Sequence, residues 1–361
     1  MALFVFLCMN EELERSPYAV TSLLFDRNSP ALIKAAVMTF VIGMELAALL
    51  LLFSTKLNSC IFVLWLCSAC VPFADLYFEI GLLAYNALGV LLCFFVASSS
   101  SPSKTSKMFF TVSLVVAHLV GAKHTMINDV TIELDGLPSA LHGLRIAHLS
   151  DLHIGPTLGL AFVELVVERT IQTKPDLIVI TGDVMDGTAA ANRDASLPLG
   201  RLRAYAPTFM VTGNHDHLHG DVDNILERMR ELGVVPLRDD LKILERLQLV
   251  GVDDYSFSKK TNLTEHWDPL YPGVLLAHQP KSVPVVLDAY GGSLLVLSGH
   301  THCGQMFPFQ LLAWFGNPYF CGHYVVQKHQ HVYVSAGTGH WGPNMRLWAT
   351  AEIVVHTLIS L

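Results

Sequence analysis

Charged residues are scarce in this chain, and the shortage is confined to its first third. Asp, Glu, Lys and Arg make up 15% of the 361 residues, whereas roughly a quarter is usual in soluble proteins. Between residues 35 and 103 the charged residues are only Glu45, Lys56, Asp75 and Glu79. After residue 121 the charge is ordinary for a globular domain. This distribution argues against a chain that is soluble throughout.

Polar stripes are also missing from the apolar stretches of this first part. A soluble helix normally carries a polar face, and a helix needs about 20 apolar residues to cross a bilayer. We therefore predict a multi-pass integral membrane region over residues 1–125, with about four helices, and a globular domain over residues 126–361. The predicted spans lie near residues 31–53, 60–73, 76–96 and 108–122.

Three further absences narrow the class of protein. The net charge of −8 comes with no basic cluster, so no nucleic-acid surface is indicated. The opening MALFVFLCMN has no basic segment and no obvious cleavage site, so we do not predict a cleaved signal peptide. Five of the seven cysteines lie in the apolar region, which leaves Cys303 and Cys321, too few for a disulfide framework. The side of the membrane on which the domain lies stays open.

The second part of the chain alternates short apolar runs with amphipathic segments. The runs are rich in Val, Ile and Leu and end in Ser, Thr or Gly, which is typical of buried strands. Helical spacing follows in residues 161–172 and 222–232, and a further helix is expected from Pro280. Strands separated by helices predict an α/β sheet with both faces covered. The five expected strands are residues 144–150, 176–182, 207–213, 273–280 and 293–300. Residues 239–254 and 347–358 are further candidates, plausibly antiparallel.

Each of the five strands leads into polar residues of the kinds that bind metals. Ligand sites in α/β sheets form beyond the carboxyl ends of the strands, so these residues are expected to meet. The set consists of Asp151, His153, Asp183, Asn214, His278, His300 and His302. Two histidines spaced i and i+2, such as His300 and His302, point to the same side of an extended segment. Alone, that pair is as well explained by a polar loop tip.

Two carboxylates, one amide and four imidazoles suffice for two metal ions that share one carboxylate. Mixed oxygen and nitrogen donors suit Mn, Fe or Zn. A pair of divalent ions can hold a phosphoryl group and activate a water for in-line displacement, which favours hydrolysis of a phosphoester. A purely structural zinc site is the alternative, but such sites usually contain several cysteines.

The order of these blocks resembles a known family. D-x-H, G-D, G-N-H-D, a single His and G-H-x-H, each after a strand, is similar to the signature of the calcineurin-like metallophosphoesterases. The resemblance covers residues 144 to the C-terminus and implies a β-sandwich core flanked by helices, in four layers α/β/β/α. The apolar first part and the ending VYVSAGTGHWGPNMRLW most resemble the membrane-associated phosphodiesterases of the family, which implies a phosphodiester as the substrate.

The resemblance also assigns roles. One ion would be bound by Asp151, His153, Asp183 and His302, and the other by Asp183, Asn214, His278 and His300, with Asp183 as the bridge. His215 is implied to contact the phosphate and to protonate or stabilise the leaving oxygen. Asp216 is implied to orient His215. Beside this set, Cys303 stands where relatives often have glycine.

Several polar residues keep two interpretations. Asp186 is either a partner of a ligand or a loop carboxylate, and His217 and His219 either contact substrate or are solvated. His340 lies in the glycine-rich GTGHWGP and either approaches the site or does not. The apolar segment of residues 303–322 either packs on the sheet or meets the bilayer, where it would admit a lipid-linked substrate.

Two functions therefore remain open from the sequence. The favoured one is a membrane-anchored phosphohydrolase with two divalent metal ions, whose partners are a phosphoester and the lipid bilayer. The alternative is a non-catalytic membrane receptor or scaffold that binds a phosphorylated ligand. The complete ligand set favours the enzyme, because a domain that has lost catalysis usually loses ligands as well.

Overall fold

The structure is a computed structural model, and it describes residues 125–360 apart from 258–266, 306–308, 328–329, 343, 345, 347 and 348. The predicted spans near residues 31–53, 60–73, 76–96 and 108–122 lie outside the described residues. Within the described part of the chain, no helix combines the length and the apolar character needed to span a bilayer.

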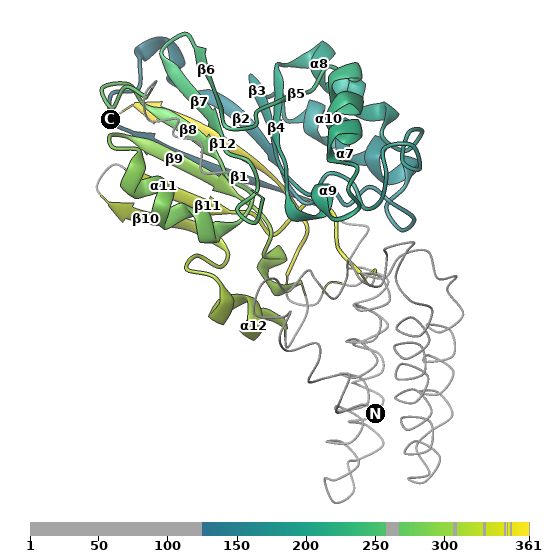
Figure 1. The fold of residues 1–361 in the computed structure, drawn as a ribbon. Coiled ribbons are helices and arrows are strands. Elements are labelled where there is room, and N and C mark those ends of the chain that lie inside the picture. Colours follow the sequence, from purple (N-terminus) through teal and green to yellow (C-terminus); the bar gives the residue numbers. More distant parts are fainter. Residues whose placement is uncertain are drawn as a thin grey trace, which may run out of the picture. The chain divides into compact units, whose positions relative to one another are not determined.

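Two six-stranded sheets form the centre of the domain (Figure 1). The strands of the first sheet, in spatial order, are β1 (Met126–Leu134), β12 (Glu352–Ser360), β2 (Leu144–Leu149), β3 (Leu177–Thr181), β4 (Thr208–Val211) and β5 (Val235–Pro236). Those of the second sheet are β10 (Gly322–Gln327), β11 (Gln330–Val334), β9 (Leu294–Ser298), β8 (Gly273–Leu276), β7 (Leu247–Gly251) and β6 (Asp240–Leu244). Both sheets are mixed, with parallel pairs at their centres.

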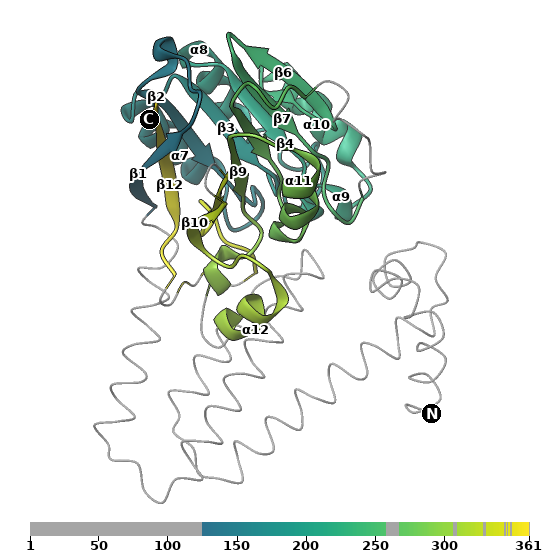
Figure 2. The ribbon, with the colours of Figure 1, turned by 90° about the vertical axis from the view of Figure 1, so that its left-hand side faces the viewer.

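Helices cover the outer face of each sheet (Figures 1 and 2). The first sheet is covered by α7 (Leu160–Gln172), α8 (Leu202–Tyr205) and α10 (Val222–Glu231), and the second by α11 (Val283–Ala289). The remaining short elements are η1 (Ser139–Leu141), η2 (Leu197–Arg201), α9 (Asn214–Leu218), η4 (Pro280–Ser282), η5 (His302–Gly304) and α12 (Phe309–Gly316). The predicted four-layer architecture is confirmed.

Three apolar clusters hold these layers together. The strand side chains that point inward, such as Ile146 and Leu295, are buried between the two sheets. Those on the outer face of the first sheet, such as Ile178, pack against Val166 and Met229 of its helices. A third cluster joins the second sheet to α11 through Val286. Burial of both faces explains why the central strands read as continuous apolar runs.

The five predicted strands are all present, and the two less certain segments also form strands. Residues 239–254 contain β6 and β7, which pair antiparallel. Residues 347–358 contain most of β12, which pairs antiparallel with β2 and parallel with β1. The sequence did not predict β1, β10, β11 or α12.

Candidate metal centre

The seven predicted ligand residues all lie just beyond strands. Asp151 and His153 follow β2, Asp183 follows β3, Asn214 begins α9 after β4, His278 follows β8, and His300 and His302 follow β9. Five of them have positive φ angles, between 45° and 68°, namely Asp151, His153, Asp183, His300 and His302. Positive φ is uncommon outside glycine, so the backbone turns sharply at each of these strand ends.

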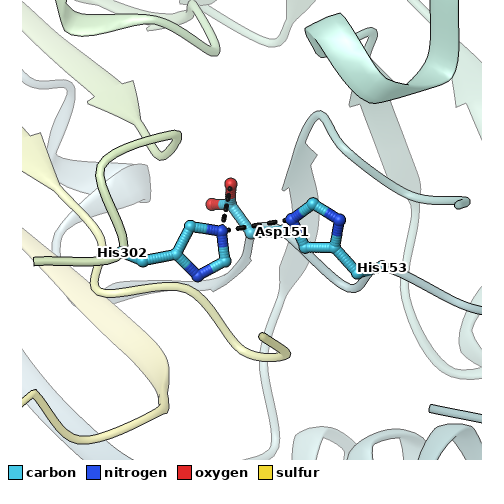
Figure 3. Close-up of side chains that lie close together, drawn as sticks. All are labelled: Asp151, His153 and His302. Atoms are coloured by element: carbon cyan, nitrogen blue, oxygen red, sulfur yellow. Dashed lines mark hydrogen bonds and ion pairs between the residues drawn. The ribbon is translucent and has the colours of Figure 1, made fainter. Parts of the chain in front are cut away.

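Asp151, His153 and His302 form the first candidate ligand set, called the first set below (Figure 3). The His302 Nε2 atom lies 3.3 Å from Asp151 Oδ1 and 3.1 Å from His153 Nε2. At most 2% of each of these side chains is exposed. Two imidazole nitrogens and a carboxylate oxygen thus face one another in the interior, which is the geometry of ligands around a shared cation.

Asp183, His278 and His300 form the second set, and Asn214 lies beside it. The His278 Nε2 atom is 3.2 Å from Asp183 Oδ2 and 3.2 Å from Asn214 Oδ1. The Nδ1 atom of His278 is 2.7 Å from the carbonyl oxygen of Thr181. This second contact orients the ring so that Nε2 is directed at the carboxylate.

Asp183 connects the two sets. Its Oδ2 atom lies 3.2 Å from His278 Nε2 in the second set and 3.8 Å from His153 Nε2 in the first. Its Oδ1 atom accepts a hydrogen bond of 2.8 Å from the backbone N–H of His215. One oxygen is therefore fixed by the backbone and the other lies between the two sets, as a bridging ligand requires. The residues fit two divalent cations with mixed oxygen and nitrogen ligands.

Two glycines make room for this carboxylate and its neighbours. A Cβ atom on Gly213 would lie 2.2 Å from Asp183 Oδ1. A Cβ atom on Gly182 would lie 2.7 Å from His278 Nδ1, and the φ of +85° at Gly182 disfavours any other residue. The glycines of the G-D and G-N-H-D blocks are thus required by close packing around Asp183.

Asp186 holds a ligand and a further histidine through one oxygen atom. Its Oδ1 lies 2.9 Å from Nδ1 of His153 and 2.7 Å from Nδ1 of His215. A carboxylate on the outer nitrogen of a metal-binding histidine fixes the ring and increases its basicity. Of the two interpretations of Asp186, the structure favours a partner of a ligand.

The contacts of Asp216 differ from those expected for the role that the resemblance implied, which was to orient His215. Its carboxylate accepts hydrogen bonds from the backbone N–H groups of Gly213, Val184 and Met185, at 2.9 to 3.1 Å. These contacts link the loop after β3 to the loop that precedes α9. The carboxylate on Nδ1 of His215 is that of Asp186, so we assign the orienting role to Asp186. The side chain of Asp216 is occupied by these backbone N–H groups.

His215 remains the most accessible histidine of the centre that has a carboxylate partner. Its side chain is 15% exposed, compared with 2% for His302. Burial alone would lower the pKa of His215, but the carboxylates of Asp183 and Asp186 raise it to about 9. This pKa favours the protonated imidazole at neutral pH, which is the form that can donate a proton to a leaving oxygen.

Arg346 contacts a residue of the first set, and the sequence did not identify it. Its Nη2 atom lies 3.2 Å from Nδ1 of His302 and bonds the carbonyl oxygens of Ala336 and Gly337 at 2.8 and 3.3 Å. The guanidinium is buried and contacts the ring of His302 on the side away from Asp151. No motif includes this residue, because 44 positions separate it from His302 in the sequence.

A chain of hydrogen bonds runs from Asp151 into the space between the sheets. Ser150 Oγ donates to Asp151 Oδ2 at 2.5 Å, and Thr181 Oγ1 donates to Ser150 Oγ at 2.8 Å. His148 Nε2 lies 2.8 Å from Thr181 Oγ1, and its Nδ1 lies 3.3 Å from Nε2 of His356. One set of tautomers lets every member donate toward the carboxylate, which strengthens the bonds of the chain.

The two histidines of this hydrogen-bonded chain, His148 and His356, predict that the folded domain is less stable in acid. Burial lowers the pKa of His148 to about 3 and that of His356 well below its usual value. The unfolded imidazoles bind protons near pH 6.5 and the folded ones do not, so stability is lost as pH falls below about 6.5. In chelator, we expect urea unfolding to show a loss of about 1.4 kcal/mol per pH unit for each neutral histidine.

His148→Gln should reduce this slope, whereas the change His142→Gln at an exposed position should leave it unchanged. A slope that is the same in all three proteins would contradict the assignment of neutral histidines between the sheets.

The structure also shows the surroundings of the other residues for which the sequence left two interpretations. His217 lies 3.4 Å from Asp253 Oδ1 and stacks on Phe257, so its contacts are with the domain itself. His219 is half-buried at the end of α9. His340 is 1% exposed, and neither ring nitrogen has a hydrogen-bond partner among the described residues. Its neighbour Gly339 donates to the backbone carbonyl of Asp151.

Known proteins share this sequence pattern. The model of the calcineurin-like phosphoesterase family matches residues 144–304. A transmembrane protein with metallophosphoesterase domain from Danio rerio is 36% identical over 278 residues, which are 72% of this chain and 63% of that protein. The protein of the same name from Bos taurus is 34% identical over 321 residues, 76% of this chain and 72% of that protein.

A bacterial relative is similar at the same level. An uncharacterized metallophosphoesterase of Helicobacter pylori is 35% identical over 246 residues, 66% of this chain and 65% of that protein. This chain thus spans slightly less than two thirds of the Danio rerio and Helicobacter pylori proteins. The fold, the clustered aspartates and histidines and these relatives agree: the chain belongs to the calcineurin-like phosphoesterase family.

Proposed function

We propose that the protein is a membrane-anchored hydrolase that cleaves a phosphodiester with two divalent metal ions. The position of Asp183 Oδ2 between His153 and His278 carries this proposal. When bound, the two ions polarise the phosphoryl group and lower the pKa of a water near it. Membrane anchoring is supported by the apolar first third of the sequence and by the relatives named as transmembrane proteins.

The side chains of the domain divide the remaining work. In this proposal Asp151, His153, Asp183 and His302 hold one ion, and Asp183, Asn214, His278 and His300 hold the other. His215 contacts the phosphate and donates its proton to the leaving oxygen. Asp186 fixes the ring of His215 through Nδ1 and at the same time orients His153. Burial of the ligands excludes bulk water and strengthens each charged contact.

Hydrolysis of a chromogenic phosphodiester and of the matching monoester by the detergent-solubilised chain tests this function. We expect turnover with Mn²⁺ or Zn²⁺, loss of turnover in chelator, recovery when metal returns, and a higher rate on the diester. If the chain binds two ions but hydrolyses neither compound with any metal, the alternative of a receptor or scaffold for a phosphorylated ligand is favoured instead.

An exposed aromatic pair supports a lipid-linked substrate. In α12, Trp314 is 57% and Phe315 is 77% exposed, while Tyr319 and Phe320 further along pack on the domain. Part of the segment therefore packs on the domain, and the exposed pair supports the interpretation in which the rest meets the bilayer. Aromatic side chains favour the membrane interface, and α12 follows η5, the element that carries His302.

Trp314→Ala is expected to lower hydrolysis of a phosphodiester lipid in vesicles about tenfold, since a large buried apolar group contributes about 1.5 to 3 kcal/mol. Hydrolysis of a soluble diester should stay the same. The control is Ile243→Ala, which changes a similarly exposed apolar residue in β6, the edge strand of the second sheet opposite β10. Equal rates on both substrates, together with no effect of Trp314→Ala, would rule out the lipid preference.

A further inference from the structure

A disulfide bond joins Cys303 to Cys321 directly beside the first ligand set. The two Cα atoms are 5.1 Å apart and the residues are 18 positions apart in the sequence. Cys303 follows His302 within η5, and Cys321 precedes β10, the edge strand of the second sheet. The bond thus connects the loop that carries a metal ligand to the edge of the sheet.

The backbone of this loop needs an external restraint. The φ angle is 49° at His302 and 48° at Cys303. The left-handed region costs a residue with a side chain about 1 to 2 kcal/mol, so two successive residues adopt it only when their surroundings hold them. Without such restraints the loop would relax and His302 would turn away from Asp151.

The disulfide and a hydrogen bond of Thr301 join this loop to the segment before β10, and Tyr324 orders that segment. Thr301 Oγ1 donates to the carbonyl of Phe320 at 2.7 Å. The hydroxyl of Tyr324 accepts from the backbone N–H groups of Phe320 and Cys321, at 3.1 and 3.2 Å. The two cysteines also share a small apolar cluster with Phe320. The disulfide is the covalent member of this group, and the only one that a reductant can break.

The second ligand set does not depend on this segment to the same degree. Asp183 and His278 lie beyond the central strands β3 and β8. His278 is further held by its contact with the Thr181 carbonyl. His300, which shares the loop with His302, donates its backbone N–H to both oxygens of Asp151, at 3.0 and 3.1 Å. Movement near residue 303 therefore affects His302 first.

We propose that the Cys303–Cys321 disulfide holds His302 in its metal-binding position, so that reduction weakens the first metal site and leaves the second occupied. This inference rests on the two-metal function proposed above. Cys303 and Cys321 act as positioning residues, since neither belongs to a ligand set. The enzyme is then fully loaded only when this bond is oxidised.

Reduction is chemically simple at this place. A phosphine reductant breaks the sulfur–sulfur bond, gives up two electrons and leaves as its oxide, while water supplies the oxygen atom and the two protons of the thiols. Cys303 is buried at 6% exposure and Cys321 is half-buried, so we expect the reductant to approach from the side of Cys321.

Metal titration of the full detergent-solubilised chain, before and after phosphine treatment and removal of the reagent, tests the inference. Titration with Mn²⁺ and metal content per chain report binding without reference to hydrolysis. We expect two ions before treatment. After treatment we expect one ion of unchanged affinity and one weakened at least about tenfold, which is the usual size of effects on residues that orient a ligand.

Variants distinguish the effect of losing the disulfide from other effects of the phosphine. Cys321→Ser removes the bond without substituting any residue of the His302 loop, and it should show the weakened site before any treatment. The double variant Cys303→Ser with Cys321→Ser should also show the weakened first site before treatment. Phosphine should not change its metal binding further, although its five other cysteines remain. Retention of one tightly bound ion and an unchanged circular dichroism spectrum would show that these chains are folded.

Three results would overturn the inference. One is two equally tight ions after mass spectrometry has confirmed that both thiols are free. Another is loss of both ions together, because the restraint would then not be specific to one site. A third is the presence of free thiols at both positions in the untreated protein. Fewer than two ions in the oxidised chain would instead contradict the two-metal function itself.

Discussion

Asp183→Asn is expected to abolish metal-dependent hydrolysis almost completely. The change keeps the size of the side chain but removes the negative charge that lies between His153 and His278. Both metal sites lose their shared ligand, so stabilisation of several kcal/mol is lost from the reaction, or at least about a thousandfold in rate. Because the carboxylate is shared, we expect bound metal to fall below two ions per chain as well.

The matched control for this change is Asp288→Asn, which alters an exposed aspartate on α11. It should retain the metal content and the turnover of the unmodified chain. If Asp183→Asn binds two ions with normal affinity and hydrolyses the diester at the normal rate, Asp183 is not the bridge between the sites.

His215→Asn is expected to reduce kcat while leaving both metal sites filled. A proton donor in the transition state contributes about 10²- to 10⁴-fold. His215 belongs to neither ligand set of the proposed two-ion site, so metal content should stay the same. The loss should be largest for an alkyl ester, whose leaving oxygen needs the proton, and small for a nitrophenyl ester, whose leaving group departs without it.

The pH dependence of kcat gives a second test of the role of His215. The carboxylates of Asp183 and Asp186, acting against burial, raise the pKa of His215 to about 9. The proton is therefore present at neutral pH and is lost as pH rises through about 9, so kcat for the alkyl ester should fall over this range. An equal loss for both esters, or a variant with the same alkaline decline as the unmodified chain, would exclude His215 as the donor.

The sequence predicted the central strands well because their signals are local. Continuous apolar runs ending in Ser, Thr or Gly identify strands buried on both faces, and such runs precede Asp151, Asp183 and His300. The carboxyl ends of neighbouring parallel strands lie together, so order along the chain was enough to predict convergence of the ligands. The proposed ligand residues lie together because each follows one of these strands.

Edge strands and contacts between distant segments escaped prediction for physical reasons. β1 is largely exposed over its first residues, and β10 and β11 carry histidines and glutamines, so no continuous apolar run marks them. The partners His148 and His356 are 208 positions apart, and only the pairing of β12 with β2 brings them together. The displaced role of Asp216 depends on the direction of one carboxylate, which spacing does not determine.

The left-handed backbone at five of the seven proposed ligand positions has a consequence for how this domain tolerates change. Glycine adopts that conformation without steric penalty, so His153→Gly or His302→Gly would relieve local backbone strain. Selection for a more stable fold and selection for metal binding therefore act in opposite directions at these positions. A descendant that no longer needed catalysis would be expected to lose its centre here first.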